Sequence, residues 1–414
     1  MSSETHPVVI VGAGQAGSEL AFALRQQGYE GRILLIGDEP ELPYRRPPLS
    51  KAYLSGEVTR ESLLIRSQAA CDKQQIECLT GVSVESIDRA AHTVRLSNGQ
   101  VQAYSKLALT TGGRVRKLDA AGAQKPNVFY VRTVADIDQL KASFVAGARL
   151  LVIGGGYIGL EAAAVGIKKG LSVTIVEALP RLLARVAAPE ISAFYQQAHS
   201  KRGVDIRLAT SITEFIGDER VTAVRLSDGS EVALDLIVVG IGILPNTELA
   251  AAAGLAIDNG IVVNEFAQTA DPDVFACGDC ANHINGFLGR SVRLESVPSA
   301  QEQARTAALT LCGKPAPHAA VPWFWSDQFE LKLQMVGLSQ GYEQLVFRGD
   351  PATESFSAFY LKDGVIVSAD AISRPQEFAV AKRLVSDRIR VSPEALADET
   401  VPLKTHLPPA APTA

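Results

Sequence analysis

The sequence is poor in cysteine and has no long apolar run, and each shortage excludes a class of protein. Only five of its 414 residues are cysteines, an odd count too low for a disulfide framework. They are Cys71, Cys78, Cys277, Cys280 and Cys312. They form neither the paired C-x-x-C of a zinc site nor the C-x4-C-x2-C run of an iron–sulfur protein, so we expect no metal centre. No apolar run reaches the roughly 18 residues that a transmembrane helix needs.

A strong excess of charge is also missing. The formal net charge is −5, which gives no support for a nucleic-acid partner. The N-terminal residues MSSETHPVVIVGAG lack the basic region and long apolar core of a signal peptide, so we expect a cytoplasmic protein. Hydrophobic residues make up 47% of the chain, enough for large cores, and the length suggests roughly two to four domains.

The most informative stretch is LLVIGGGYIGLEAAAVGIKKGLSVTIVE, residues 150–177. An apolar run predicts a buried parallel strand, G-x-G-x-x-G spacing follows at Gly154, Gly156 and Gly159, and apolar residues then recur at helical spacing. A second strand ends at Glu177. This order of strand, tight turn, helix, strand and acid is typical of a dinucleotide-binding unit.

Each glycine of the motif has a physical reason. The first allows a sharp turn, the second lets the backbone approach a pyrophosphate, and the third lets the helix pack on the strand. The N–H groups of the first helical turn then face the phosphates, aided by the helix dipole. Glu177 lies near the offset expected for an acid that accepts from ribose hydroxyls and disfavours a 2′-phosphate. Arg181 and Arg185 stand nearby and could instead meet the phosphates.

The same unit occurs a second time near the N-terminus. A strand over 8–11 precedes Gly12, Gly14 and Gly17, and a second strand over 32–36 precedes Asp38 and Glu39. One chain with two such units usually binds two different dinucleotides.

Further along, a short strand over 274–276 delivers Gly278 and Asp279, and a carboxylate there could hold a sugar-alcohol hydroxyl. Glycines in GIGILPN, 240–246, resemble a return crossover, so we expect the second unit to be inserted into the first. Residues 77–89 and 92–96 alternate like antiparallel strands. Strands over 341–347, 356–361 and 365–371 and a helix over 375–386 form a last region, and the tail LPPAAPTA predicts disorder.

Two other features have competing interpretations. Cys277 and Cys280 form a C-x-x-C, which is either a redox dithiol or, as we favour, two buried small residues. The histidines are scattered, and we expect surface or loop positions for all of them. They are His6, His92, His199, His283, His318 and His406.

Taken together, these motifs resemble those of the oxygenase-coupled NADH–ferredoxin reductases, of the putidaredoxin reductase and aromatic-ring dioxygenase reductase type. The resemblance covers nearly the whole chain. It rests on the two glycine motifs and on PPLSKAYL, LALTTGGR, GGGYIGLE, GIGILPN, TADPDVFACGDCA, RLESVPSAQEQA and VPWFWSDQFELKLQMVG.

The resemblance implies an α/β fold with two Rossmann-like dinucleotide-binding domains, similar to glutathione reductase, and a C-terminal α/β domain. We expect a discontinuous FAD domain over 1–113 and 241–320, a NAD domain over 114–240, and a C-terminal domain with a disordered tail over 321–414. The FAD residues that the resemblance implies are Gly12, Gly14, Ala16, Gly17, Asp38, Lys51, Val84, Arg132, Asp279, Val297 and Trp325. The NAD residues are Gly155, Gly156, Ile158, Glu177 and Glu295.

The resemblance also implies a reaction, in which electrons pass from NADH through FAD to a [2Fe–2S] ferredoxin that serves an oxygenase. Lys51 is expected beside the flavin, where a cation stabilises developing negative charge, and Glu161 is expected to pair with it. Glu295 would accept from the nicotinamide amide, and Trp325 would cover the flavin. An acidic ferredoxin predicts a local basic patch, for which Arg66, Arg305 and Lys404 are candidates.

Three alternatives share the fold. A disulfide reductase would carry C-x4-C where this chain has Arg-Arg-Pro-Pro-Leu-Ser-Lys, 45–51, and an NADH oxidase or peroxidase would also need a cysteine there. Cys71 is too far along to serve. A flavin-bound, NADH-sensing interaction protein of the apoptosis-inducing-factor type predicts slow turnover with every acceptor.

Overall fold

The computed structural model describes residues 6–409, which form two compact units. The first unit holds residues 6–45, 60–114 and 243–322, and the second holds 46–59, 115–242 and 323–409. Residues 115–242 and 323–409 group together in the second unit, so this division into two units does not separate the expected NAD domain from the expected C-terminal domain. The three-domain division stays a prediction.

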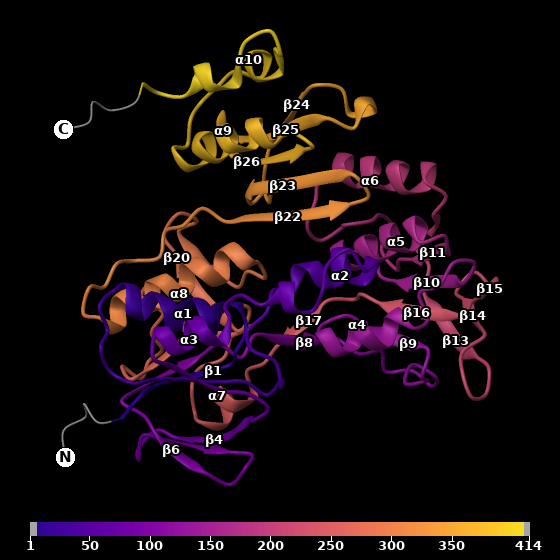
Figure 1. Ribbon diagram of the computed structural model, residues 1–414. Coiled ribbons are helices and arrows are strands. Elements are labelled where there is room, and N and C mark those ends of the chain that lie inside the picture. The colour runs from indigo at the N-terminus through magenta and orange to yellow at the C-terminus, as the bar shows by residue number, and fades with distance from the viewer. Residues whose placement is uncertain (1–5, 410–414) are drawn as a thin grey trace. The chain divides into compact units, whose positions relative to one another are not determined.

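The first unit is built on a five-stranded parallel sheet in the order β19-β7-β1-β2-β3. Its strands are β1 (Val8–Val11), β2 (Ile33–Ile36), β3 (Ile76–Leu79), β7 (Lys106–Leu109) and β19 (Val274–Ala276). Every residue of β1 and β2 is buried, as expected for strands covered on both faces. On one face, helices α1 (Gln15–Gln26) and α8 (Val297–Leu311) pack together (Figure 1).

Smaller elements complete the first unit. One antiparallel sheet joins β4 (Val84–Asp88), β5 (Thr93–Leu96) and β6 (Val101–Ala103), and another sheet joins β18 (Ile261–Val263), β20 (Ala281–Asn285) and β21 (Arg290–Val292). Short helices are α3 (Gln68–Lys73) and α7 (Glu248–Ala252). The antiparallel strand expected over 77–89 is wrong in its first part: Glu77 belongs to β3, which pairs in parallel with β2, and the chain turns at Gly81 (φ +70°) before β4 begins.

The second unit contains the sheet predicted around residues 150–177. All pairings are parallel, in the order β12-β11-β10-β16-β9. The strands are β9 (Val128–Tyr130), β10 (Arg149–Ile153), β11 (Ser172–Val176), β12 (Asp205–Arg207) and β16 (Leu236–Val239). The helices are α2 (Ala52–Ser55), α4 (Val134–Lys141), α5 (Tyr157–Lys168) and α6 (Pro189–Lys201). An antiparallel sheet of β13 (Ile212–Ile216), β14 (Ala223–Leu226) and β15 (Glu231–Ala233) flanks them.

The same unit carries a five-stranded antiparallel sheet near its C-terminal end, in the order β22-β23-β26-β25-β24. Its strands are β22 (Trp323–Gln328), β23 (Leu331–Gly337), β24 (Gln344–Arg348), β25 (Phe356–Lys362) and β26 (Val365–Ile372), followed by α9 (Pro375–Ser386) and α10 (Pro393–Ala397). Strand β22 packs against α5, and Figure 1 shows α6 beside the same strands. Short strands β8 (Gly113–Val115) and β17 (Ile243–Pro245) lie where the chain passes from one unit to the other.

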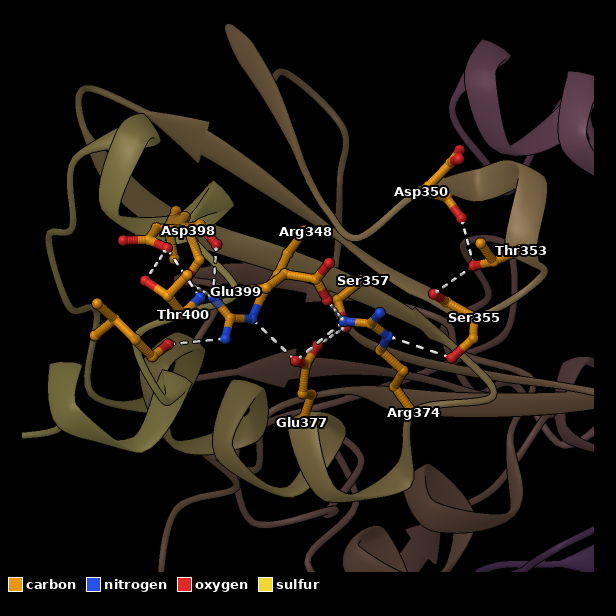
Figure 2. Close-up of polar contacts among 12 residues, drawn as sticks. Arg348, Asp350, Thr353, Ser355, Ser357, Arg374, Glu377, Asp398, Glu399 and Thr400 are labelled. Atoms are coloured by element: carbon orange, nitrogen blue, oxygen red, sulfur yellow. Dashed lines mark hydrogen bonds and ion pairs between the residues drawn. The ribbon is translucent and has the colours of Figure 1, made fainter.

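Arg348, at the end of β24, connects residues 396–401 to this sheet through hydrogen bonds (Figure 2). The side chain is almost fully buried, and its Nε donates to Glu377 at 2.9 Å. Its Nη atoms donate to three main-chain carbonyls, those of Leu396, Asp398 and Val401. A buried charge needs such partners in place of water, so α10 and the residues after it supply the acceptors that the Arg348 guanidinium requires. Residues 410–414, the end of the tail expected to be disordered, lie outside the described residues.

Candidate functional site

The first glycine turn forms a cradle at the end of β1. Gly12 has φ +111°, and a Cβ there would lie 2.2 Å from the carbonyl oxygen of Thr110. A Cβ at Gly17 would lie 2.1 Å from the oxygen of Gly12, so these two glycines are required by packing within the protein. Gly14 differs, because a Cβ there would meet nothing within 4 Å. Protein packing does not explain the middle glycine, whereas close approach of a phosphate does.

The second glycine turn repeats this arrangement in the other unit. A Cβ at Gly154 would lie 2.5 Å from the oxygen of Gly240, and one at Gly159 would lie 2.1 Å from the oxygen of Gly154. The nearest atom to a Cβ at Gly156 is 3.9 Å away. Neither α1 nor α5 has a side-chain N-cap or an acidic residue in its own first turn, so no side chain of the helix itself takes up its N-terminal N–H groups. Both cradles therefore fit a pyrophosphate.

The acid after the second strand differs between the two cradles. Glu177 follows β11 directly, and its carboxylate accepts from the N–H of Gly155 at 2.6 Å and of Leu179 at 2.8 Å. Each oxygen keeps a further lone pair for a ribose hydroxyl. In the first unit Gly37 takes the equivalent place after β2, where a Cβ would lie 2.6 Å from that of Ala13. Asp38 comes one residue later and is exposed.

The other residues assigned to FAD divide between the two units. Ala16 is buried against Gly278, where a Cβ would come within 2.9 Å of that of Ala16, and Asp279 follows directly. The first unit thus brings Asp279 to its glycine cradle. Val297 begins α8, and Val84 begins β4. The residues from the second unit are Lys51, Arg132 and Trp325.

Four of the five residues assigned to NAD lie in the second unit: Gly155, Gly156, Ile158 and Glu177. Ile158 stands in the first turn of α5 and is 42% exposed. Glu295 belongs to the first unit and forms an ion pair with Arg293 at 2.7 Å. Arg181, a candidate for the phosphates, instead donates to the carbonyls of its own loop and to Ser192 at 2.6 Å, so its guanidinium has a structural role.

Lys51 and Glu161 form the predicted ion pair, with Nζ 2.8 Å from Oε2. Only 2% of the Glu161 side chain is exposed, so it is not the solvated helix residue that its polar character alone would suggest. Sequence reasoning missed its other partners: Ser50 Oγ donates to Oε2 at 2.5 Å, and Ser326 Oγ donates to Oε1 at 2.6 Å. The alternating spacing of Ser326 and Gln328 in β22 was the available signal, because it places both on one face of the strand.

The expectation of surface or loop positions for the histidines is wrong for two of the six. His199 lies in α6 and His283 in β20, and both are buried, which lowers the pKa of His199 to about 4 and that of His283 to about 3. His318 is buried too, but it lies in a loop as expected. His283 and His318 contact each other edge to face with ring centroids 4.7 Å apart. Their burial depends on contacts between segments distant in sequence, which a single sequence does not reveal.

The positions of Cys277 and Cys280 disfavour a redox role for the C-x-x-C motif. Cys277 and Cys280 are fully buried, and desolvation raises the pKa of both thiols, which disfavours the reactive thiolate. All five cysteines are free. Within residues 6–409 no cluster of three or more His, Cys, Asp or Glu side chains is arranged to hold a metal ion. In the same described part of the chain, no helix is both long and apolar enough to cross a membrane.

The candidates for a basic patch differ in the partners of their charged groups. Arg305 forms ion pairs with Glu19 and Glu302, so its charge is compensated. Arg66 lies over the ring of Phe22 at 5.2 Å. The docking surface stays a prediction.

Comparison with known proteins gives two family matches. Residues 6–304 match the family described as pyridine nucleotide-disulphide oxidoreductase, and residues 323–407 match the reductase C-terminal family. Putidaredoxin reductase of Pseudomonas putida is 49% identical over 403 residues, which are 96% of each protein. Rhodocoxin reductase of Rhodococcus erythropolis is 43% identical over 96% of this chain and 93% of its own length.

Solved structures agree with these matches. The covalent putidaredoxin reductase–putidaredoxin complex contains a chain that superimposes with a TM-score of 0.94 at 48% identity, covering 97% of this chain and 98% of that one. Both the length of the match and its identity exceed what a shared fold alone would give. The chain belongs to the pyridine nucleotide-disulphide oxidoreductase family, in the group of ferredoxin–NAD reductases that includes putidaredoxin reductase.

Proposed function

We propose that this protein passes electrons from NADH through FAD to a [2Fe–2S] ferredoxin that serves an oxygenase, either a haem-thiolate monooxygenase or a ring-hydroxylating dioxygenase. The observation that carries the proposal is the pair of glycine cradles with open middle glycines, Gly14 and Gly156, in a chain whose cysteines are not placed for disulfide chemistry. The relatives named above are reductases of redoxins, which supports the choice of acceptor.

The two cradles take different cofactors in this proposal. FAD binds at Gly12, Gly14 and Gly17, with Asp279 on its ribityl chain, and NADH binds at Gly156 with Glu177 on its ribose. When bound, FAD accepts two electrons from NADH and returns them singly to a one-electron acceptor. The protein itself then has to bind the two cofactors, orient them toward each other and supply charge beside the flavin.

Lys51 supplies that charge in the proposal. Its ammonium is held by a buried carboxylate, and its side chain is 18% exposed, so the side chain is ordered and still partly accessible to a cofactor. A fixed cation beside the flavin stabilises negative charge as it develops and costs no reorganisation. We also propose a cytoplasmic location, which the five free thiols and the use of NADH favour.

The experiment is the acceptor dependence of turnover. The purified FAD-loaded protein is given NADH and cytochrome c, with and without a [2Fe–2S] ferredoxin. We expect cytochrome c reduction to rise steeply with ferredoxin concentration and then saturate. Rates indifferent to ferredoxin, with peroxide as the product, would identify an NADH oxidase. Slow reduction of every acceptor would identify an NADH-sensing protein.

A further inference from the structure

A chain of buried hydrogen bonds extends from Lys51 through the C-terminal sheet to α6, all within the second unit. Lys51 Nζ lies 2.8 Å from Glu161 Oε2, and Ser326 Oγ donates to Glu161 Oε1 at 2.6 Å. Gln328 Nε2 donates to Ser326 Oγ at 3.2 Å, and His199 Nε2 lies 2.9 Å from Gln328 Oε1. Ser326, Gln328 and His199 are each 0% exposed.

The direction of every hydrogen bond in this chain follows from its chemistry. The Glu161 carboxylate can only accept, so the Ser326 hydroxyl donates to it and has a lone pair left for the Gln328 amide. Gln328 then offers its oxygen, and His199 must carry its proton on Nε2. Burial lowers the pKa of His199 to about 4, so the ring is neutral, and its Nδ1 has no partner within the described residues. All the hydrogen bonds in this series are therefore donated in the same direction, from His199 toward Glu161.

Strand geometry explains why β22 can make these contacts. Ser326 and Gln328 are two residues apart, so both face the same side of the strand, as does Phe324. The Phe324 ring packs against Tyr157 at the start of α5, with ring centroids 4.7 Å apart. This contact fixes β22 on the helix that carries Glu161. The C-terminal sheet thus holds the carboxylate oxygen opposite to the one that Lys51 uses.

We propose that Ser326, supported by Gln328 and His199, is a positioning residue that holds Glu161 and through it the Lys51 ammonium. Without the Ser326 hydroxyl, Glu161 Oε1 would be buried without this donor, and the carboxylate would be held through Oε2 alone, by Lys51 and Ser50, so its orientation toward Lys51 would be less well fixed. The inference rests on the proposed role of Lys51 at the flavin. It assigns to the C-terminal sheet a part in reduction of FAD by NADH.

The experiment compares four variants by anaerobic stopped-flow reduction of FAD: Ser326→Ala, Ser326→Thr, Lys51→Met and the double variant Ser326→Ala/Lys51→Met. We expect Ser326→Ala to lower the limiting rate about tenfold, the fold-change of one hydrogen bond to a charged group, with less than about twofold change in the NADH concentration at half-maximal rate. Ser326→Thr keeps the hydroxyl and should recover most of the rate. The midpoint potential of the bound FAD should fall in Ser326→Ala and in Lys51→Met alike, because both weaken a cation beside it.

The matched control is Ser368→Ala. Ser368 is a 2% exposed serine of the same sheet whose hydroxyl donates to the carbonyl of Val336 at 2.8 Å, away from the chain described. It should lose a similar amount of thermal stability and keep the wild-type rate and potential. FAD content, read from the visible absorbance of each variant, separates loss of cofactor from slow reduction.

The double variant decides the matter. If Ser326 acts through Lys51, the double variant should reduce FAD no more slowly than Lys51→Met alone. Multiplied effects in the double variant, or a wild-type rate and potential in Ser326→Ala, would overturn the inference. A wild-type rate in Lys51→Met would instead overturn the proposed role of Lys51, so the two failures are distinguishable.

Discussion

Glu177→Gln is the substitution whose effect follows most directly from the structure. The carboxylate accepts from the N–H of Gly155 at 2.6 Å and from that of Leu179 at 2.8 Å. A glutamine has one oxygen to replace the two, so one of these N–H groups loses its acceptor and faces an NH2 group. A hydrogen bond to a charged group contributes about 1.5–3 kcal/mol, which corresponds to roughly 10- to 150-fold in binding.

The two coenzymes should respond differently. NADH loses a ribose acceptor and a well-formed turn, so its kcat/KM should fall at least about tenfold. NADPH suffers the same damage to the turn but also loses the repulsion between the carboxylate and its 2′-phosphate, so its kcat/KM should fall less. The ratio of the two kcat/KM values, NADH over NADPH, should therefore shrink.

The assay measures that ratio for wild type, Glu177→Gln and Glu219→Gln, with ferricyanide as acceptor so that ferredoxin docking does not enter. Glu219 is an exposed acid of the same unit, and its substitution controls for loss of one negative charge. An unchanged ratio in Glu177→Gln would refute the reasoning, because the carboxylate would then have no part in coenzyme choice. A ratio that shrinks equally in Glu219→Gln would refute it too, since general charge would be the cause.

Three further predictions concern the cradle, the C-terminal segment and a buried acid. Gly156→Ala should keep the wild-type melting temperature and raise KM for NADH about tenfold or more, whereas Gly159→Ala, with its Cβ 2.1 Å from a carbonyl oxygen, should lose at least about 1–3 kcal/mol of stability. Arg348→Met should cost about 3–5 kcal/mol in denaturant unfolding and expose the amides of residues 392–401 to hydrogen exchange. Burial raises the pKa of Asp370 to about 7, so the folded state keeps a proton that the unfolded state releases above about pH 4, and stability should fall as pH rises toward 7. Asp370→Asn should abolish that part of the decline, measured as melting temperature against pH.

The two nucleotide units could be predicted because their signals are local. The runs at 8–11 and 150–153 became the central strands of the two parallel sheets, and the glycine spacing sets where α1 and α5 begin. The helix predicted over 375–386 has the bounds of α9. In each case the residues that decide the structure are neighbours in sequence, so pattern alone carries the information.

Other features depend on contacts between distant residues. Residues 77–79 alternate like the start of an antiparallel strand, yet pairing with β2 places them at the edge of the parallel sheet. His199 looks like a surface residue of an amphipathic helix until β22, more than 120 positions later, covers it with Gln328. Likewise, the Ser326–Glu161 hydrogen bond joins residues 165 positions apart. Tertiary packing sets these environments, and one sequence without relatives gives no sign of it.

The central claim is that electrons from NADH leave this protein one at a time for a [2Fe–2S] ferredoxin. The most direct measurement is an anaerobic titration of NADH into a catalytic amount of the FAD-loaded protein with excess oxidised ferredoxin, followed by the visible absorbance of the iron–sulfur centre. The account predicts that two ferredoxins are reduced for each NADH consumed. Ferredoxin that stays oxidised while the protein's own flavin is fully reduced by NADH would contradict it.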